Sequence, residues 1–302
     1  MKKIGLALGG GGARGLAHIG ILKVLENAHV PIHAISGISM GAILGACYAI
    51  EPDAEKLEKR VREVLAGKSF KSLRMDMFKS GKNEKSTLGF LEKARSFIIN
   101  GYMHIVEETK PAFFTLEQLE KIVCALLPDI DIADTKIPFA VLVTDLSNGR
   151  AKVFTKGSLR TSVIASSSIA GIFPPVVIDG IYYNDGGYVG SVPVQGVKNL
   201  GAEYVIACDV KSKVLKIKKI LMAKDVISRS EYITGTILNN CILEEADLVI
   251  SPAVKHITWT GFDKVDFLIQ KGESAALLKL PEIIISVGYK NIIYKIKSLF
   301  GL

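Results

Sequence analysis

The sequence has little that would support a disulfide framework, a zinc site or a membrane span. Its four cysteines, Cys47, Cys124, Cys208 and Cys241, are scattered without a CxxC pair, so we expect buried free thiols. No uninterrupted apolar run reaches the roughly 20 residues that a spanning helix needs, although the mean hydropathy is +0.32. Residues 4–8 are too short for the apolar core of a signal peptide, and glycines follow them directly. We therefore expect a cytosolic protein.

Acidic residues are absent from two lysine-rich stretches, and the whole chain carries a net charge of +8. Six lysines lie in the stretch Lys211–Lys224, and three lie among apolar residues in the stretch Ser286–Leu302. Either stretch suits peripheral contact with an anionic membrane, although the second reads as a basic amphipathic helix that could equally pack on its own domain. The lysine clusters lack interleaved aromatic residues and Trp259 is the only tryptophan, so we expect no nucleic-acid partner.

The apolar pattern indicates an α/β chain in which strands and helices alternate. Strands are expected at residues 3–8, 31–36, 137–146, 152–155, 204–209 and 248–250, with a hairpin turning at Asp179-Gly180. Helices are expected near residues 15–28, 40–49, 53–66, 87–100, 115–126, 159–168 and from 263 onward. Residues 67–86 lack a period and are expected to form an exposed excursion. The alternation predicts a mainly parallel sheet covered by helices on both faces.

The clearest motif is Gly37-Ile38-Ser39-Met40-Gly41, which lies between a predicted strand and a predicted helix. A serine on such a tight turn exposes its hydroxyl, and glycines two residues away on either side let the backbone cross without a Cβ clash. The helix that starts at Met40 directs its first N–H groups toward a developing oxyanion. The motif favours Ser39 as a nucleophile, although a plain strand–helix turn of small residues has the same spacing.

A second glycine-rich turn, Gly9-Gly10-Gly11-Gly12-Ala13-Arg14-Gly15, joins the first strand to the first helix. Consecutive glycines let backbone N–H groups converge on an anion, and Arg14 adds a positive charge. The spacing also fits the dinucleotide pattern G-x-G-x-x-G, but the next strand ends in Ile35-Ser36 without the acid that would hold a ribose. No Gly-Lys-Ser/Thr follows, so a P-loop does not fit either. We interpret the turn as an oxyanion hole.

A third motif, Asp185-Gly186-Gly187, follows the predicted hairpin. A carboxylate before two glycines sits where backbone can approach closely, so it could reach a serine hydroxyl. Asp-Gly is also a common turn dipeptide, so this motif is weak by itself.

The order and spacing of the three motifs resemble the patatin-like phospholipase family, and within it the small single-domain bacterial members. The resemblance runs through residues 3–201 and includes Ala17-His18-Ile19-Gly20 and Ala165-Ser166-Ser167-Ser168 before Pro174-Pro175. It implies a three-layer α/β/α fold, with a catalytic core at residues 4–200 and residues 201–302 completing the same domain. The family often opens its glycine loop with Asp where this sequence has Gly9, which matters little if the following amides are the donors.

The resemblance also implies a serine lipid acyl hydrolase of the phospholipase A, lysophospholipase or carboxylesterase type, without a metal or cofactor. Ser39 would attack the acyl carbonyl while Asp185 accepts its proton, forming an acyl-enzyme through a Ser–Asp dyad. Because a carboxylate is a weak base unless desolvated, we expect a partly dry site. Residues 67–86 could then cover the acyl channel. The oxyanion hole would draw on Gly10, Gly11, Gly12, Ala13, Arg14, Gly15 and Met40.

Two other functions stay open. A Ser–His–Asp triad would combine Ser39, Asp145 or Asp185, and His256, in the chain order of α/β-hydrolases. In that fold the nucleophile follows a middle strand, whereas Ser39 follows only the second strand of the chain. His18 is a further candidate base, but the helix from residue 15 is expected to carry it away from the glycine loop. We therefore interpret His18 as a packing or hydrogen-bonding residue and His256 as a surface or structural one. The other alternative is a lipid-binding or scaffold protein with an inert site on the same fold.

Overall fold

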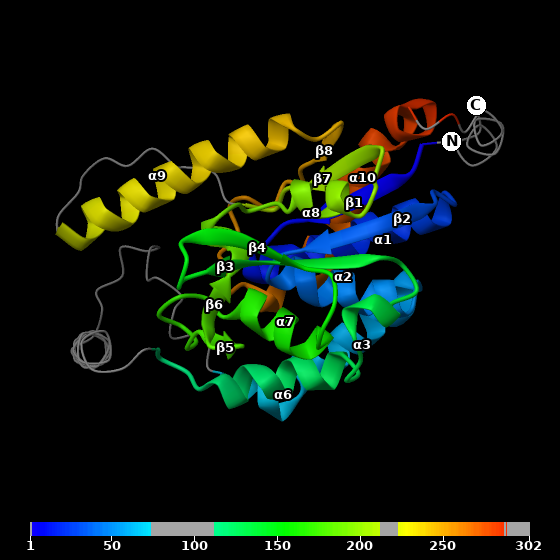
Figure 1. Ribbon diagram of the computed structural model, residues 1–302. Helices are drawn as coiled ribbons and strands as arrows, with labels where there is room; N and C mark the ends of the chain where they lie inside the picture. The colour runs from blue at the N-terminus through cyan, green and yellow to red at the C-terminus, as the bar shows by residue number, and fades with distance from the viewer. Residues whose placement is uncertain (1, 74–111, 212–222, 287, 289–302) are drawn as a thin grey trace, which may run out of the picture.

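One mostly parallel sheet forms the centre of the molecule. The computed structural model describes residues 2–73, 112–211, 223–286 and 288 of the chain (Figure 1). Within them, eight strands pair in the order β5-β6-β3-β2-β1-β7-β8, with β4 pairing to β3 off this path. The β3–β2–β1–β7–β8 pairings are parallel, whereas those of β4, β5 and β6 are antiparallel. The strands are β1 Ile4–Leu8, β2 Ile32–Gly37, β3 Phe139–Asp145, β4 Arg150–Phe154, β5 Val176–Ile178, β6 Ile181–Asp185, β7 Tyr204–Cys208 and β8 Leu248–Ile250.

Helices cover both faces of this sheet, which confirms the predicted three-layer α/β/α fold. The α-helices are α1 Ala17–Asn27, α2 Met40–Ile50, α3 Ala54–Ala66, α4 Lys68–Ser72, α6 Leu116–Leu126, α7 Leu159–Ser167, α8 Val194–Asn199, α9 Ala223–Glu244 and α10 Val265–Ser286. Short 3-10 turns are η1 Gly12–Leu16, η3 Ile132–Asp134, η4 Gly186–Tyr188 and η5 Phe262–Lys264.

The alternation of side chains along β1 shows how the two faces differ. Ile4, Leu6 and Leu8 join the large core formed with α1, α2, α3, α7 and α10. Ala7, on the opposite face, packs in a smaller core with valines of α8 and, at its edge, Ile242 of α9. The larger core follows from the period-2 pattern of a central strand combined with the apolar faces of several helices.

The stretch after residue 200 takes part in the same packing. Strand β7 pairs along the whole of β1. Helix α10 packs closely on α1, because an added Cβ at Gly272 would collide with the carbonyl of Ala17. These contacts support the prediction that residues 4–200 and the described part of 201–302 form one domain. The predicted terminal helix of residues 286–302 lies almost entirely outside the described residues.

Several local predictions need correction. The first helix starts at Ala17 rather than near residue 15, because the glycine loop continues into η1. Residues 68–72 of the predicted excursion form the short helix α4, whereas residues 74–86 and the predicted helix at 87–100 lie outside the described residues. The prediction of four buried free thiols is correct for Cys47 and Cys208 and wrong for Cys124 and Cys241, which are exposed. The hairpin prediction is confirmed, with positive φ at both Asp179 and Gly180.

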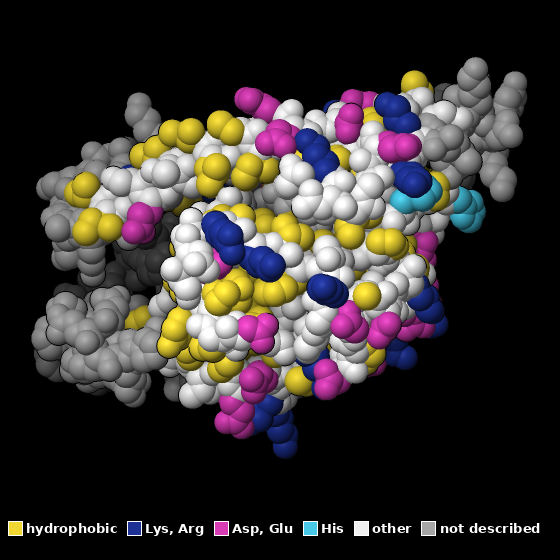
Figure 2. All heavy atoms as spheres, viewed as in Figure 1, with side chains coloured by type: hydrophobic (Ala, Val, Ile, Leu, Met, Phe, Trp, Pro, Cys, Tyr) yellow, Lys and Arg dark blue, Asp and Glu magenta, His cyan; other side chains and the backbone are white. Residues whose placement is uncertain are grey.

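Helix α9 was not predicted from the sequence. It is 22 residues long and projects from one side of the body (Figure 1). The space-filling view shows apolar side chains gathered along it (Figure 2). Among the described residues, no helix is long and apolar enough to cross a membrane.

Candidate active site

Ser39 lies at the junction of β2 and α2 with a backbone that serine rarely adopts. Its φ is 53° and its ψ is −124°, so the residue is strained by an amount of order 1–3 kcal/mol. The flanking glycines make the turn possible, because a Cβ at Gly37 would meet the backbone of Ala42 and one at Gly41 would meet the carbonyl of Leu8. The predicted elbow geometry is therefore present. The side chain is largely buried, with 7% of Ser39 exposed.

The amide of Ser39 is held by a second serine. Ser39 N donates to Ser166 Oγ at 3.0 Å, and Ser166 Oγ in turn donates to the Leu142 carbonyl at 2.7 Å. Ser166 lies in the last turn of α7 and is fully buried. In the sequence, Ser166 stands out only as part of the run Ser166-Ser167-Ser168, and no role was predicted for it. No periodic or motif signal marks it, because its partners are backbone groups of distant segments.

Asp185 ends β6 and turns into η4. Its amide donates to the Ser168 carbonyl at 3.0 Å, and its own carbonyl accepts from Thr144 Oγ1 at 2.8 Å. The carboxylate oxygen Oδ1 accepts the Gly187 amide at 2.7 Å, which satisfies one oxygen within the Asp-Gly-Gly turn. Ser166 and Ser168 are neighbours at the end of α7, so one helix terminus positions the backbone of both Ser39 and Asp185.

The Ser39 and Asp185 side chains meet. Burial raises the pKa of the Asp185 carboxyl from its ordinary value to about 6, and hydrogen bonds from the Gly187 amide and the Ser39 side chain work in the opposite direction. Only 6% of Asp185 is exposed. Desolvation is the dominant cause, as the expectation of a partly dry site requires. A carboxyl with a pKa near neutrality can both accept and return a proton at physiological pH.

Some backbone amides of the glycine loop already donate hydrogen bonds within the protein, and others do not. The Gly10 amide donates to the Ser191 carbonyl at 2.9 Å, the Ala13 amide to Trp259 at 2.7 Å and the Arg14 amide to Gly11 at 3.3 Å. These three are already committed, and Gly15 lies inside the 3-10 turn. Within the described residues, no hydrogen bond is found from the amides of Gly11, Gly12 and Met40. Of the amides predicted for an oxyanion hole, these three are therefore the ones left to bind an anion.

The Arg14 side chain is hydrogen-bonded to backbone carbonyls of other segments, so it holds the glycine loop in place and does not offer a free charge to a ligand. Its Nε donates to the Val210 carbonyl at 2.9 Å and its Nη1 to the Ile257 carbonyl at 3.0 Å. Burial lowers the pKa of Arg14, and the charge of Asp209 acts in the opposite direction. Gly12, with a φ of +56°, passes so close to the Trp259 carbonyl that a Cβ would collide with it. Segments beyond residue 200 thus complete the loop, which sequence reasoning missed.

The histidines take no part in the contacts found for the two carboxylates. Asp145 is bound by the Ser147 amide, Asn148 and Arg150, and no histidine is among the groups that shift the pKa of Asp145 or Asp185. The ring of His256 packs edge-on against Phe267. A triad is therefore not assembled among the described residues.

Two sequence arguments about this site are wrong. His18 is not carried away from the glycine loop, since its Nε2 lies 2.8 Å from the Gly9 carbonyl and donates to it in the matching tautomer. Burial lowers the pKa of His18 to about 4, so the ring is neutral. Strand β2 is second along the chain, yet it lies in the middle of the sheet, and so Ser39 does follow a middle strand. The order of the strands along the chain did not predict their order in the sheet, because later strands add to both edges of the β2–β1 pair.

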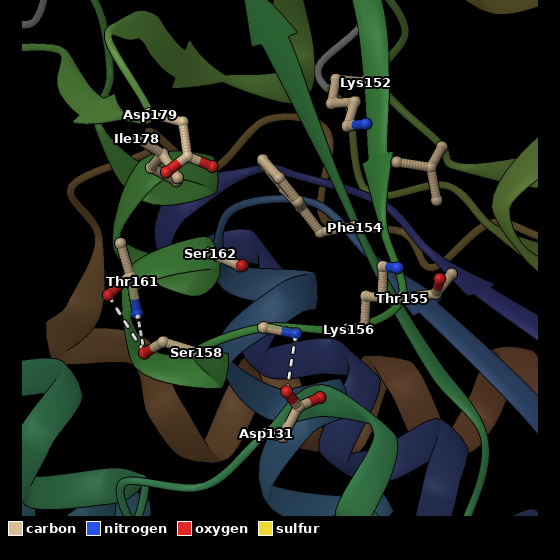
Figure 3. Close-up of a pocket in the computed structure, with 12 residues that line it drawn as sticks. Asp131, Lys152, Phe154, Thr155, Lys156, Ser158, Thr161, Ser162, Ile178 and Asp179 are labelled. Atoms are coloured by element: carbon tan, nitrogen blue, oxygen red, sulfur yellow. Dashed lines mark hydrogen bonds between the residues drawn. The ribbon is translucent and has the colours of Figure 1, made fainter.

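A cavity of about 680 Å³ lies elsewhere on the molecule (Figure 3). Its lining comes from β4, the start of α7 and the turn after β5, including Phe154, Ser162 and Asp179. None of the motif residues lines it. Figure 3 shows Lys152 and Lys156 at its rim, with the Asp131 carboxylate accepting the Gly157 amide below them. This cavity is separate from the Ser39–Asp185 contact.

We predict that Ser166→Ala weakens the site by releasing the Ser39 amide. The substitution leaves that buried amide without its acceptor and removes one donor from the Leu142 carbonyl, which should cost about 1–3 kcal/mol of stability. It should also lower kcat for ester hydrolysis at least about tenfold with little change in KM, because the strained turn loses its support. Ser168→Ala is the matched control, since the Ser168 hydroxyl donates only within α7, to the Ile164 carbonyl. Equal loss of kcat in both variants would contradict this role.

Comparison with known proteins identifies relatives of this chain. A family model described as patatin-like phospholipase matches residues 6–198. Neuropathy target esterase sws of Drosophila melanogaster is 33% identical over 216 residues, which cover 70% of this chain and 13% of that protein. Patatin-like phospholipase domain-containing protein 6 of Homo sapiens is 33% identical over 214 residues, covering 70% and 13%. Lysophospholipase nte1 of Emericella nidulans is 30% identical over 213 residues, covering 70% and 12%.

Among solved structures, VipD from Legionella pneumophila aligns with 93% of this chain and 67% of its own, at 14% identity and a TM-score of 0.47. The curated relatives named above are much longer proteins, of which the matched region is only 12% to 13%. The family model covers more than half of the chain and includes all three motifs. The chain therefore belongs to the patatin-like phospholipase family.

Proposed function

We propose that the protein is a serine lipid acyl hydrolase, a carboxylic ester hydrolase that acts on lipid esters. The observation that carries the proposal is the buried contact between Ser39 and Asp185, in which burial raises the carboxyl pKa to about 6. The names of the relatives, an esterase, a phospholipase and a lysophospholipase, support the same class of reaction. Phospholipase A, lysophospholipase and simple esterase activities are the substrate classes to compare.

In the first half of the reaction, Ser39 Oγ attacks the acyl carbonyl and Asp185 takes the hydroxyl proton. The carbon–oxygen bond to the alcohol then breaks, the proton passes from Asp185 to the leaving alkoxide, and the acyl group stays on Ser39. In the second half, a water molecule gives its proton to Asp185 and attacks the acyl-enzyme. Collapse of this second intermediate returns the proton to Ser39 and releases the fatty acid.

The negative charge that develops on the carbonyl oxygen needs donors that are not already used. The amides of Gly11, Gly12 and Met40 fill this role in the proposal, and Met40 begins α2, whose N-terminus favours negative charge. Loss of one such donor typically costs about 3 kcal/mol of transition-state stabilisation. No step requires a metal or another cofactor.

The intact dyad weighs against an inert scaffold. A binding protein has no need of a strained Ser39 or of a carboxylate whose burial raises its pKa. For partners, we propose the lipid substrate itself and peripheral contact with anionic membranes. Residues 211–224 and 286–302 stay sequence predictions as contact regions, since most of both stretches lie outside the described residues.

A substrate panel tests the proposed function. Wild-type protein should hydrolyse at least one of a diacyl phospholipid, a lysophospholipid and a short-chain water-soluble ester, and Ser39→Ala should lower kcat about a thousandfold or more. His256→Ala is the control that separates the dyad from a triad, and it should keep wild-type activity. Undiminished hydrolysis by Ser39→Ala would refute the proposal.

The pH dependence of kcat/KM should report Asp185. Because the base must be ionised, kcat/KM should be level above pH about 6 and fall about tenfold per unit below it.

The raised pKa of Asp185 also means that its ionisation destabilises the folded protein. The free energy of unfolding should therefore fall as the pH rises from about 4 toward 6. Asp185→Asn should therefore be inactive yet unfold no more easily at pH 8, with a gain of up to about 1–3 kcal/mol. A profile that is flat down to pH 4.5 would contradict this assignment.

A further inference from the structure

Helix α9 carries an aliphatic stripe that the rest of the described protein does not cover. Val226, Ile227, Ile233, Ile237 and Leu238 are between 39% and 61% exposed. Positions 226, 230, 233, 237 and 241 recur at intervals of three or four, so they share one face of the helix with Ser230 and the exposed Cys241. Figure 2 shows groups of apolar side chains along the helix.

The opposite face of α9 is anchored to the domain. Lys211 Nζ donates to the carbonyl of Gly235, and Asn239 is buried. Ile242 packs against the backbone at Gly190, where an added Cβ would collide with it. The helix is therefore held firmly by one face while the aliphatic face points to solvent. Exposed stripes of this size on a fixed helix usually mark an interaction surface.

Helix α9 lies close to the turn that carries Asp185. Tyr188 follows the Asp185-Gly186-Gly187 turn, is 55% exposed, and has its pKa raised by burial and by the charges of Asp185 and Glu231, the latter on α9. Strand β2, which leads into Ser39, points toward the side from which α9 projects (Figure 1). Contact of the stripe with a lipid surface would hold the segment that follows Asp185 near that surface.

Charge and length select a bilayer as the partner. No charged residue lies on the central face formed by Val226, Ile233 and Ile237, whereas the exposed Glu231 shares the edge of the stripe with Ile227 and Leu238. The central face therefore suits the acyl boundary of a membrane. The stripe runs about 18 Å along the helix at 1.5 Å per residue, too short to span a bilayer but long enough to lie in its surface. The sequence before α9 adds lysines without an acid, and the chain has a net charge of +8, which complements anionic head groups.

We propose that α9 is a membrane-docking helix, which lies in the surface of an anionic bilayer with Val226, Ile227, Ile233, Ile237 and Leu238 inserted below the head groups. This inference rests on the proposed function for its purpose, since docking would deliver lipid esters to Ser39. Membrane binding by α9 is a physical property of its surface, however, and can be measured without catalysis.

The test uses the full chain carrying Ser39→Ala, so that the vesicles stay intact. Co-sedimentation is measured with large unilamellar vesicles of phosphatidylcholine and phosphatidylglycerol. Ile233→Asp combined with Ile237→Asp should weaken binding at least about tenfold. The matched control combines Leu277→Asp and Leu278→Asp on α10, which are 45% and 80% exposed and add the same charge. The control should bind like the parent.

A second pair of assays separates docking from catalysis. With Ser39 intact, the α9 double variant should cleave a water-soluble short-chain ester at the wild-type rate and lose activity only on vesicles. If the wild type cleaves no ester, the proposed function fails while the binding result still decides on docking. Three results would overturn docking: vesicle binding by the α9 variant equal to the control, binding that 1 M salt abolishes completely, or a wild-type dimer that the variant converts to monomer, which would assign the stripe to a second copy.

Discussion

Burial of the Asp185 carboxylate beside the Ser39 hydroxyl is the constraint on which the site depends. A carboxylate in water is a weak base toward a serine hydroxyl, and desolvation strengthens it by raising the carboxyl pKa to about 6. The free-energy cost of burying this carboxylate is reduced by two hydrogen bonds. One carboxylate oxygen accepts the Gly187 amide, and the Ser39 side chain supplies the other bond. In the proposed mechanism Asp185 thus accepts the proton directly from Ser39, without a histidine between the two groups.

The surrounding fold can be understood as support for that contact. The end of α7 holds Ser39 through the Ser166 hydroxyl and Asp185 through the Ser168 carbonyl, so the two backbones cannot move independently. From the other side, the Trp259 carbonyl and the Arg14 guanidinium tie the glycine loop to segments after residue 200. This double bracing explains how a residue with positive φ can persist at the centre of the sheet.

The sequence predicted well wherever a local pattern decides the structure. The three motifs, the parallel sheet and the Asp179-Gly180 hairpin follow from strand periodicity and from the conformational freedom of glycine. What could not be predicted depends on long-range contact: the central position of β2, the bond from His18 to Gly9, and the role of Ser166. The amides of Gly10 and Ala13 also looked available in the sequence, because their acceptors, Ser191 and Trp259, lie far along the chain. Helix α9 was missed because its aliphatic face is solvent-exposed while its anchored face is partly polar.

The central claim concerns the reactivity of one hydroxyl, and mass spectrometry of the intact protein after treatment with a fluorophosphonate measures it directly. The account predicts a single adduct that maps to the peptide containing Ser39, and a much slower reaction in Asp185→Asn. An unmodified protein, or an adduct on a different serine, would contradict it.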